Sequence, residues 1–204
     1  MNGGDAQMNA RAPQRRIVLT GFMCAGKTTV ARALAALLGC AAADTDARVV
    51  AREGRRVEAI IDGEGEARFR QLERAALREI LEHDGDAGGA RVIALGGGAW
   101  TIEETRALIA AHDDCLTVWL DAPFELCWRR IINSADAARP LARDRERARE
   151  LYAARRAAYA LAAVRVGVTE ARSAEDTAAE IASIIGRRNF SDEHEGREGE
   201  YTDG

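Results

Sequence analysis

The residues best suited to chemistry lie near the amino end, where Gly21 opens the pattern G-x-x-x-x-G-K-T that closes at Thr28. A short apolar run precedes this pattern and a segment of helical spacing follows it, which is the context that a phosphate-binding loop requires. Glycines let the backbone turn its N–H groups toward a phosphate, Lys27 can reach the β and γ oxygens, and the Thr28 hydroxyl can ligate Mg²⁺. We therefore predict an ATP site with Mg²⁺. The expected nucleotide contacts from this loop are Gly21, Cys24, Ala25, Gly26, Lys27, Thr28 and Thr29.

The basic residues of the chain are distributed in an unusual way. Lys27 is the only lysine, against 28 arginines. Arginine carries a planar fork, whereas lysine carries a compact ammonium on a flexible stem. A lysine that occurs only in the glycine-rich loop supports the interpretation of that loop as a phosphate cradle.

Two acids, Asp44 and Asp46, follow the next short apolar stretch. On an extended segment, residues two apart point to the same side. Both carboxylates would then face one crevice, one toward a metal ion and the other toward an acceptor hydroxyl. Paired acids are also common in solvated turns and helix caps, so this pair is informative only together with other motifs.

Two further motifs suit an acceptor site. Arg70 and Glu73 are three apart in a segment of helical spacing, where a surface ion pair is the simplest interpretation. The triplet Gly96–Gly98 follows a predicted strand, and consecutive glycines let another group approach the backbone closely. A flexible turn is the alternative for the triplet.

The elements that position these residues alternate along the chain. Strands are predicted at 16–20, 91–95, 115–120 and 164–168, and helices at 28–38, 103–111, 123–132, 146–162 and 174–185. Alternation of this kind indicates a mainly parallel sheet with crossover helices on both faces. We expect an α/β fold of three layers, with ligands at the carboxyl ends of the strands.

Composition narrows the partners. The chain has 204 residues, of which 47% are hydrophobic, and is expected to form one domain at 15–187. Acids dominate the segment 188–204 and leave the rest of the chain near neutral, so nucleic acid is not an expected partner. That tail and the polar segment 1–14 are expected to be disordered. The sequence has no long apolar run and no C-x-x-C pair, and we expect a cytoplasmic monomer without a membrane partner.

The order of the motifs resembles that of the shikimate kinases, small P-loop enzymes related to nucleoside monophosphate kinases. The likeness covers residues 16 to 186 and lies in G-F-M-x-A-G-K-T-T, D-T-D, G-R-x-V-x-x-I, G-E-x-x-F-R-x-x-E, G-G-G, R-P-L and R-x-x-x-Y. Seven motifs in family order are much more specific than any one of them. The resemblance implies a five-stranded parallel sheet, a mobile lid that carries R-P-L, and ATP-dependent phosphorylation of the 3-hydroxyl of shikimate.

For the nucleotide side, the resemblance implies that Thr28 and Asp44 hold Mg²⁺. Lys27 would act on the transferring phosphoryl, and Arg139 would join it when the lid closes. Arg130, near the lid hinge, would cover the adenine.

For the acceptor side, the resemblance implies that Asp46 contacts the reacting hydroxyl and that Arg70 and Arg155 bind the carboxylate of shikimate. Asp46 is thus the third residue, with Lys27 and Arg139, expected to be catalytic. The full set of expected acceptor contacts is Asp46, Phe69, Arg70, Gly96, Gly97, Gly98 and Arg155.

The sequence also departs from the family pattern. Cys24 stands where glycine or serine is usual, Ile61 replaces an aromatic wall of the acceptor site, and Val50 and Ala142 replace other common residues. Two alternatives therefore stay open: a kinase of the same fold for another hydroxy acid or sugar acid such as gluconate, and a nucleotide-binding switch without catalysis. The glycine triplet with F-R-x-x-E argues against the first, and the complete set of polar residues argues against the second.

Overall fold

Five parallel strands form the centre of the molecule. The computed structural model describes residues 15–82, 90–133 and 144–198. The strands are β1 (Arg16–Thr20), β2 (Ala41–Asp44), β3 (Ala90–Ala94), β4 (Cys115–Asp121) and β5 (Val164–Gly167). Their order is β2-β3-β1-β4-β5, and each neighbouring pair is parallel. The chain fills one side of β1 before the other, and in such sheets the ligand lies beyond the carboxyl ends of the strands at this switch point.

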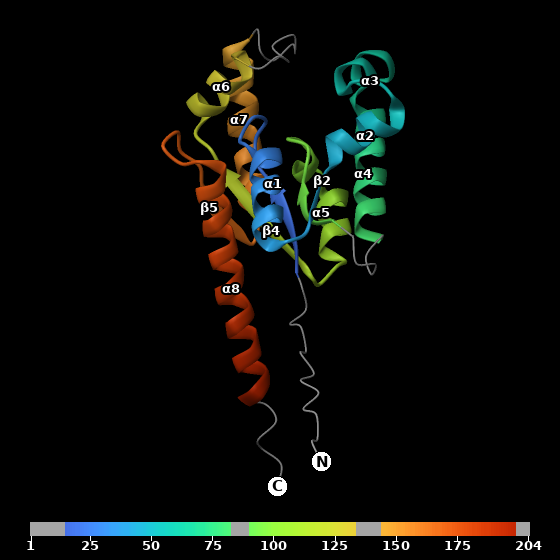
Figure 1. Cartoon of the computed structure of the whole chain (residues 1–204). Coiled ribbons are helices and arrows are strands. Elements are labelled where there is room, and N and C mark those ends of the chain that lie inside the picture. Colours follow the sequence, from blue (N-terminus) through green and yellow to red (C-terminus); the bar gives the residue numbers. More distant parts are fainter. Residues whose placement is uncertain (1–14, 83–89, 134–143, 199–204) are drawn as a thin grey trace, which may run out of the picture.

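Helices cover both faces of the sheet (Figure 1). They are α1 (Lys27–Leu38), α2 (Thr45–Glu53), α3 (Val57–Glu64), α4 (Glu66–Glu82), the short 3₁₀ helix η1 (Ala99–Thr101), α5 (Glu103–Ala110), α6 (Phe124–Ile132), α7 (Arg145–Tyr159) and α8 (Ala174–Glu198). Helices α1 and α8 pack against each other on one face, and α5 and α7 meet η1 on the other. The predicted three-layer fold with a five-stranded parallel sheet is confirmed.

Two apolar clusters stabilise this arrangement. The larger one contains the fully buried residues of the central strands, such as Ile17 and Val92, together with the inner faces of the surrounding helices. The smaller one joins α2, α3 and α4 through the buried side chains Val49, Ile60 and Phe69. Burial of apolar area is the main favourable term in folding. The α2–α4 region therefore has a core of its own beside the sheet.

Helix α2 begins where the sequence suggested an extended segment. The Asp44 carboxylate accepts a hydrogen bond from the backbone N–H of Ala47 at 3.0 Å and so caps the helix. Asp46 consequently lies in the first helical turn. The prediction that both acids belong to one extended segment was wrong, because an aspartate at the cap position satisfies an otherwise free N–H and starts a helix. Asp44 is instead a helix cap, which was the other interpretation of the paired acids.

The carboxyl-terminal helix is longer than predicted. The apolar spacing ends at Ile185, whereas α8 continues to Glu198 and extends beyond the body of the molecule (Figure 1). The predicted tail, 188–204, therefore begins within this helix. Residues 1–14 and 199–204 lie outside the described part, so the expected domain limits stay a prediction. Among the described residues, no helix has both the length and the apolar character needed to span a membrane.

Candidate functional site

The glycine-rich loop joins β1 to α1. Gly21 has φ +139°, and a Cβ at this position would lie 2.7 Å from the Leu120 carbonyl oxygen. Gly26 precedes the first residue of α1 with φ +102°. Both positions need glycine, because other residues rarely adopt these angles. Cys24 has φ +58° and is the one non-glycine residue of the described chain with positive φ.

Lys27 is the first residue of α1, and its side chain turns back into the loop. Its Nζ donates hydrogen bonds to the carbonyl oxygens of Gly21 and Phe22, each at 2.9 Å. Burial lowers the pKa of Lys27, while the charges of Asp46 and Asp44 act to raise it. The single lysine therefore folds back onto the loop, and the charges of both acids act on it.

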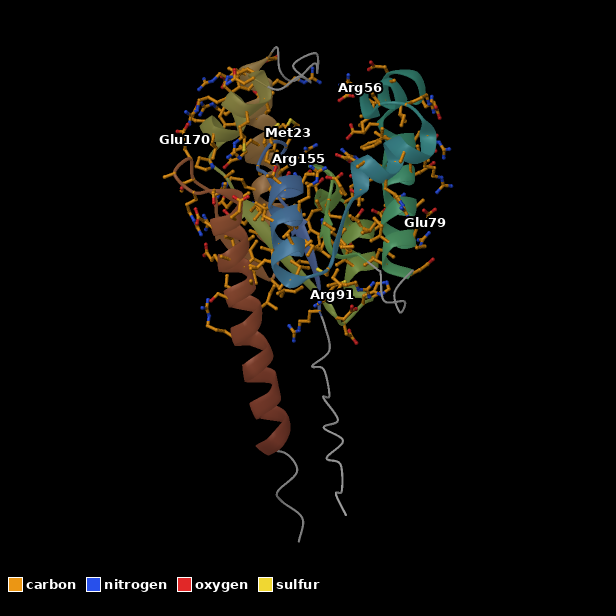
Figure 2. All side chains as sticks on the ribbon, viewed as in Figure 1. Met23, Arg56, Glu79, Arg91, Arg155 and Glu170 are labelled. Carbon is orange, nitrogen blue, oxygen red and sulfur yellow. The ribbon has the colours of Figure 1, made fainter. Side chains whose placement is uncertain are left out.

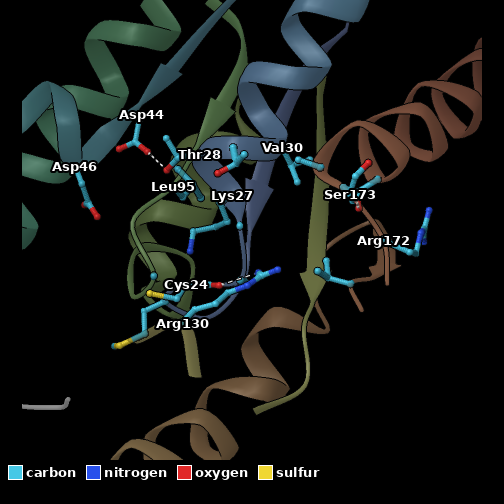
Figure 3. A pocket seen from close by; sticks show the side chains of 18 residues that line it. Cys24, Lys27, Thr28, Val30, Asp44, Asp46, Leu95, Arg130, Arg172 and Ser173 are labelled. Carbon is cyan, nitrogen blue, oxygen red and sulfur yellow. Dashed lines mark hydrogen bonds between the residues drawn. The ribbon is translucent and has the colours of Figure 1, made fainter. Parts of the chain in front are cut away.

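Thr28 and Asp44 meet across the opening of the loop. The Thr28 hydroxyl donates to Asp44 Oδ2 at 2.6 Å (Figure 3). Hydroxyl and carboxylate oxygens are the hard ligands that Mg²⁺ prefers, and this ion usually takes only one or two carboxylates beside phosphates and waters. No group of three or more His, Cys, Asp or Glu side chains suited to a metal occurs in the described chain. Thr28 and Asp44 thus fit Mg²⁺ bound with a nucleotide, rather than an all-protein metal site.

A cavity of about 620 Å³ opens over the loop and the carboxyl ends of the strands (Figure 3). Its walls include Lys27, Asp46 and Gly97, and it continues to Arg130. The Arg130 guanidinium donates to the Cys24 carbonyl oxygen at 3.2 Å. The loop and the predicted adenine-covering arginine therefore line one cavity.

Sequence reasoning missed one wall of this cavity. Val168, Arg172, Ser173 and Thr177 line its far end. They belong to the turn after β5 and the start of α8. The available signal was their place at the carboxyl end of a strand, because all such ends meet at one edge of a parallel sheet.

The glycine triplet separates the loop from the acceptor side. A Cβ on Gly96 would overlap the carboxylates of both Asp46 and Glu73. A Cβ on Gly98 would overlap Arg70 and lie 3.2 Å from Arg155 Nη2. The triplet is therefore a site of close approach for four charged side chains, and the flexible-turn interpretation does not describe it.

Gly97 lies between these two approaches. A Cβ on it would come within 3.1 Å of the Met23 nitrogen, and its carbonyl oxygen accepts hydrogen bonds from the Tyr159 hydroxyl and from Arg155 Nη1, the latter at 3.3 Å. Figure 2 shows Met23 and Arg155 toward the end of the sheet where the strands finish, with Arg91 at the opposite end. The triplet thus contacts both the phosphate loop and α7.

Arg70 is held by its own helix. Its Nη1 donates to Glu73 Oε2 at 2.7 Å, and its Nη2 donates to Glu66 Oε1 at 2.9 Å. Its guanidinium also lies over the Phe69 ring, 5.1 Å from the centroid. Phe69 is buried in the α2–α4 cluster, and Ile61 packs against this cluster. The predicted i,i+3 pair is present, and Phe69 supports Arg70 from below.

Glu73 is the residue whose importance the sequence interpretation missed. Only 2% of it is exposed. Burial raises the pKa of Glu73 to about 7, with the nearby Asp46 acting in the same direction and Arg70 in the opposite one. The spacing from Arg70 was visible in the sequence, but the contact with Asp46 depends on how α2 packs against α4.

The chain matches the shikimate kinase family over residues 23–186. It is 41% identical to a shikimate kinase of Streptomyces avermitilis over 173 residues, which are 83% of this chain and 95% of the relative. A shikimate kinase of Geobacter sulfurreducens is 38% identical over 185 residues, covering 89% and 97%. The chain belongs to the shikimate kinase family. It is therefore an ATP-dependent kinase, as its motifs predicted.

Solved structures agree with this assignment. A shikimate kinase from Acinetobacter baumannii in complex with shikimate superposes with a TM-score of 0.76 at 31% identity, covering 87% of this chain and 96% of the other. A gluconokinase from Sinorhizobium meliloti superposes with a TM-score of 0.59 at 18% identity, covering 89% and 99%, and shares the fold alone.

The expected lid lies outside the described residues. Arg139 and the R-P-L motif fall in the segment 134–143, between α6 and α7. The role expected for Arg139 stays a prediction. The remaining predicted site residues are brought to one edge of the sheet, except that Phe69 lies beneath Arg70.

Proposed function

We propose that this shikimate kinase homologue transfers the γ-phosphoryl group of ATP to the 3-hydroxyl of shikimate, giving shikimate 3-phosphate and ADP. The observation that carries the proposal is the convergence of Arg70 and Arg155 on Gly98, while Asp46 approaches Gly96 in the same triplet. This group of charges lies next to the phosphate loop, with Gly97 against Met23. Family membership and the likeness to the shikimate-bound Acinetobacter baumannii enzyme support the same substrate.

The acceptor chemistry follows from these charges. A guanidinium binds a carboxylate by charge-assisted hydrogen bonds, and two forks hold it in one orientation. With its carboxylate held by Arg70 and Arg155, shikimate would present a hydroxyl toward Asp46, which can orient it and accept its proton. Phosphoryl transfer depends mainly on positioning and on charge stabilisation. A rigid pair of arginines beside an acid provides the positioning.

The nucleotide side provides the charge stabilisation. Lys27 would exchange its two carbonyl partners for phosphate oxygens of ATP, and the loop N–H groups would bind the remaining oxygens. Thr28 and Asp44 would hold Mg²⁺, which when bound neutralises part of the phosphate charge. Arg130 would cover the adenine, and Arg139 would add a positive charge at the transferring group.

We further infer a cytoplasmic monomer that binds no nucleic acid. The near-neutral charge outside the acidic tail argues against a nucleic-acid partner, and the four free cysteines fit a reducing compartment. Light scattering after gel filtration checks the oligomeric state, and a mass of about two chains would contradict it.

A coupled ADP-release assay tests the function directly. The enzyme is supplied with Mg-ATP and with shikimate, gluconate or no acceptor. We expect turnover with shikimate and none with gluconate or without an acceptor. Turnover with gluconate alone would identify another acid as the substrate, and nucleotide binding without turnover on either acid would favour a silent switch.

A further inference from the structure

Two carboxyl groups meet behind the glycine triplet. Glu73 reaches this point from α4 and Asp46 from α2, and a Cβ on Gly96 would overlap Oε1 of the first and Oδ1 of the second. Both oxygens are shielded from solvent. Two acidic oxygens therefore lie on the same side of one glycine, in a place without water contact.

The surroundings do not favour two negative charges at this place. The other oxygen of Glu73, Oε2, is occupied by Arg70 Nη1. Like charges in a buried position repel strongly, and a proton held between two carboxyl groups relieves that repulsion. Burial and the neighbouring Asp46 both raise the pKa of Glu73, to about 7, in agreement with this geometry.

Asp46 is the better of the two groups to remain charged. It lies in the first turn of α2, where the helix favours an anion. It also lines the cavity, and its charge acts on the Lys27 ammonium. Glu73, by contrast, is almost fully buried. The proton therefore belongs on Glu73.

We propose that Glu73 acts as a neutral carboxylic acid that donates a hydrogen bond to Asp46 Oδ1 and positions this carboxylate for the acceptor hydroxyl. Glu73 is a positioning residue, since it acts through Asp46. The inference rests on the proposed function, because it names the support of the group expected to receive the acceptor's proton.

This assignment also reduces the negative charge around Arg70. A charged Glu73 together with Glu66 would surround the guanidinium with two anions. With Glu73 neutral, the anion paired with Arg70 is Glu66, whose side chain is 63% exposed and hence weakly coupled. The guanidinium, which is charged in either case, then has one anionic partner fewer to compete with the carboxylate of the substrate.

Three variants test whether Glu73 is a neutral hydrogen-bond donor or an anion. Glu73→Gln keeps a donor toward Asp46 and an acceptor toward Arg70, whereas Glu73→Met keeps the length and removes both. Glu79→Gln is the matched control, since it removes a carboxylate of the same helix that pairs with the exposed Arg52 and not with Arg70. For each variant, kcat and the KM for shikimate are measured, with the melting temperature as a check of folding.

We expect Glu73→Gln to keep kcat within about threefold and Glu73→Met to lower kcat about ten- to a hundredfold, the effect of leaving a buried polar group unpaired. Glu79→Gln should leave kcat unchanged. A Glu73→Gln enzyme with a kcat loss of ten- to a hundredfold would overturn the proposal, and so would an unchanged kcat in Glu73→Met. If the Met variant does not fold, Glu73→Gln decides alone.

An infrared difference spectrum tests the proton without any substrate. Wild type minus Glu73→Gln at pH 6 should contain the C=O stretch of a protonated carboxyl group, and a carboxylate signal in its place would overturn the proposal. A wild-type enzyme that shows the protonated band but does not phosphorylate shikimate would refute the proposed function and leave the state of Glu73 established.

Discussion

The two ends of the site are built in different ways. The nucleotide end consists mainly of backbone: glycines at unusual φ angles and a single lysine that turns back into its own loop. The acceptor end consists of charged side chains from α2, α4 and α7 that meet at three glycines. The first end can be read from eight consecutive residues, whereas the second exists only after three helices have packed. We therefore expect changes at the two ends to have separable effects on ATP and on shikimate.

The largest effect should come from the nucleotide end. Lys27→Ala removes the ammonium expected to stabilise the transferring phosphoryl, and we expect kcat to fall about a hundred- to a thousandfold. Shikimate binding, measured by calorimetry without nucleotide, should change little. A comparable loss of shikimate affinity would show that the two ends are not separable.

The next effect should come from Gly98. In Gly98→Ala the new methyl group overlaps Arg70 and crowds Arg155, so the KM for shikimate should rise about tenfold or more, in line with the loss of one charge-assisted pair. The KM for ATP should stay near that of the wild type. Gly186→Ala is the control, because a Cβ there meets nothing within 4 Å. Equal effects of both substitutions would contradict close packing at the triplet.

A third prediction concerns pH and stability. Because the pKa of Glu73 is raised to about 7 in the folded protein, this group binds more protons folded than unfolded between about pH 4.5 and 7. Its contribution is present in full below that range and is lost as the pH rises through it, at most about 3 kcal/mol. Urea unfolding across this range should show a steeper decline for wild type than for Glu73→Gln. Parallel declines would contradict the raised pKa.

The smallest effect should come from Cys24. Its left-handed backbone is unfavourable for a residue with a side chain, and Cys24→Gly should raise the free energy of unfolding by about 1 kcal/mol. Urea denaturation measures this change, with Cys40→Gly as a control at a position without positive φ. A destabilised Cys24→Gly enzyme would show that the cysteine contributes more by packing than it costs in strain.

The difference between the two ends also explains what the sequence could predict. The loop, Lys27 and the order of strands and helices depend on local signals, whereas the pairing of Thr28 with Asp44 was expected from the family resemblance. Strand β2 is short and mostly alanine, so its sequence signal for a strand is weak. The placement of Asp46 in the first turn of a helix was missed because the sequence around Asp44 fits both a strand and a capped helix.

Contacts between distant elements were not readable from local signals. The position of Glu73 against Asp46 depends on the packing of the smaller apolar cluster. The wall formed by Arg172 and Ser173 depends on where β5 ends relative to β1. Local motifs thus indicated most of the residues that the structure brings to one edge of the sheet, and the packing of the elements decided which of them touch.

The central claim is that Arg70 and Arg155 together bind the carboxylate of the acceptor. The most direct measurement compares kcat/KM for shikimate and for its methyl ester, which lacks the charge, in wild type, Arg70→Ala, Arg155→Ala and, as a control, Arg129→Ala, an exposed arginine paired with Glu170. We expect wild type and the control to prefer the acid by about tenfold or more and the two site variants to lose most of that preference. An undiminished preference for the acid in both site variants would contradict the account.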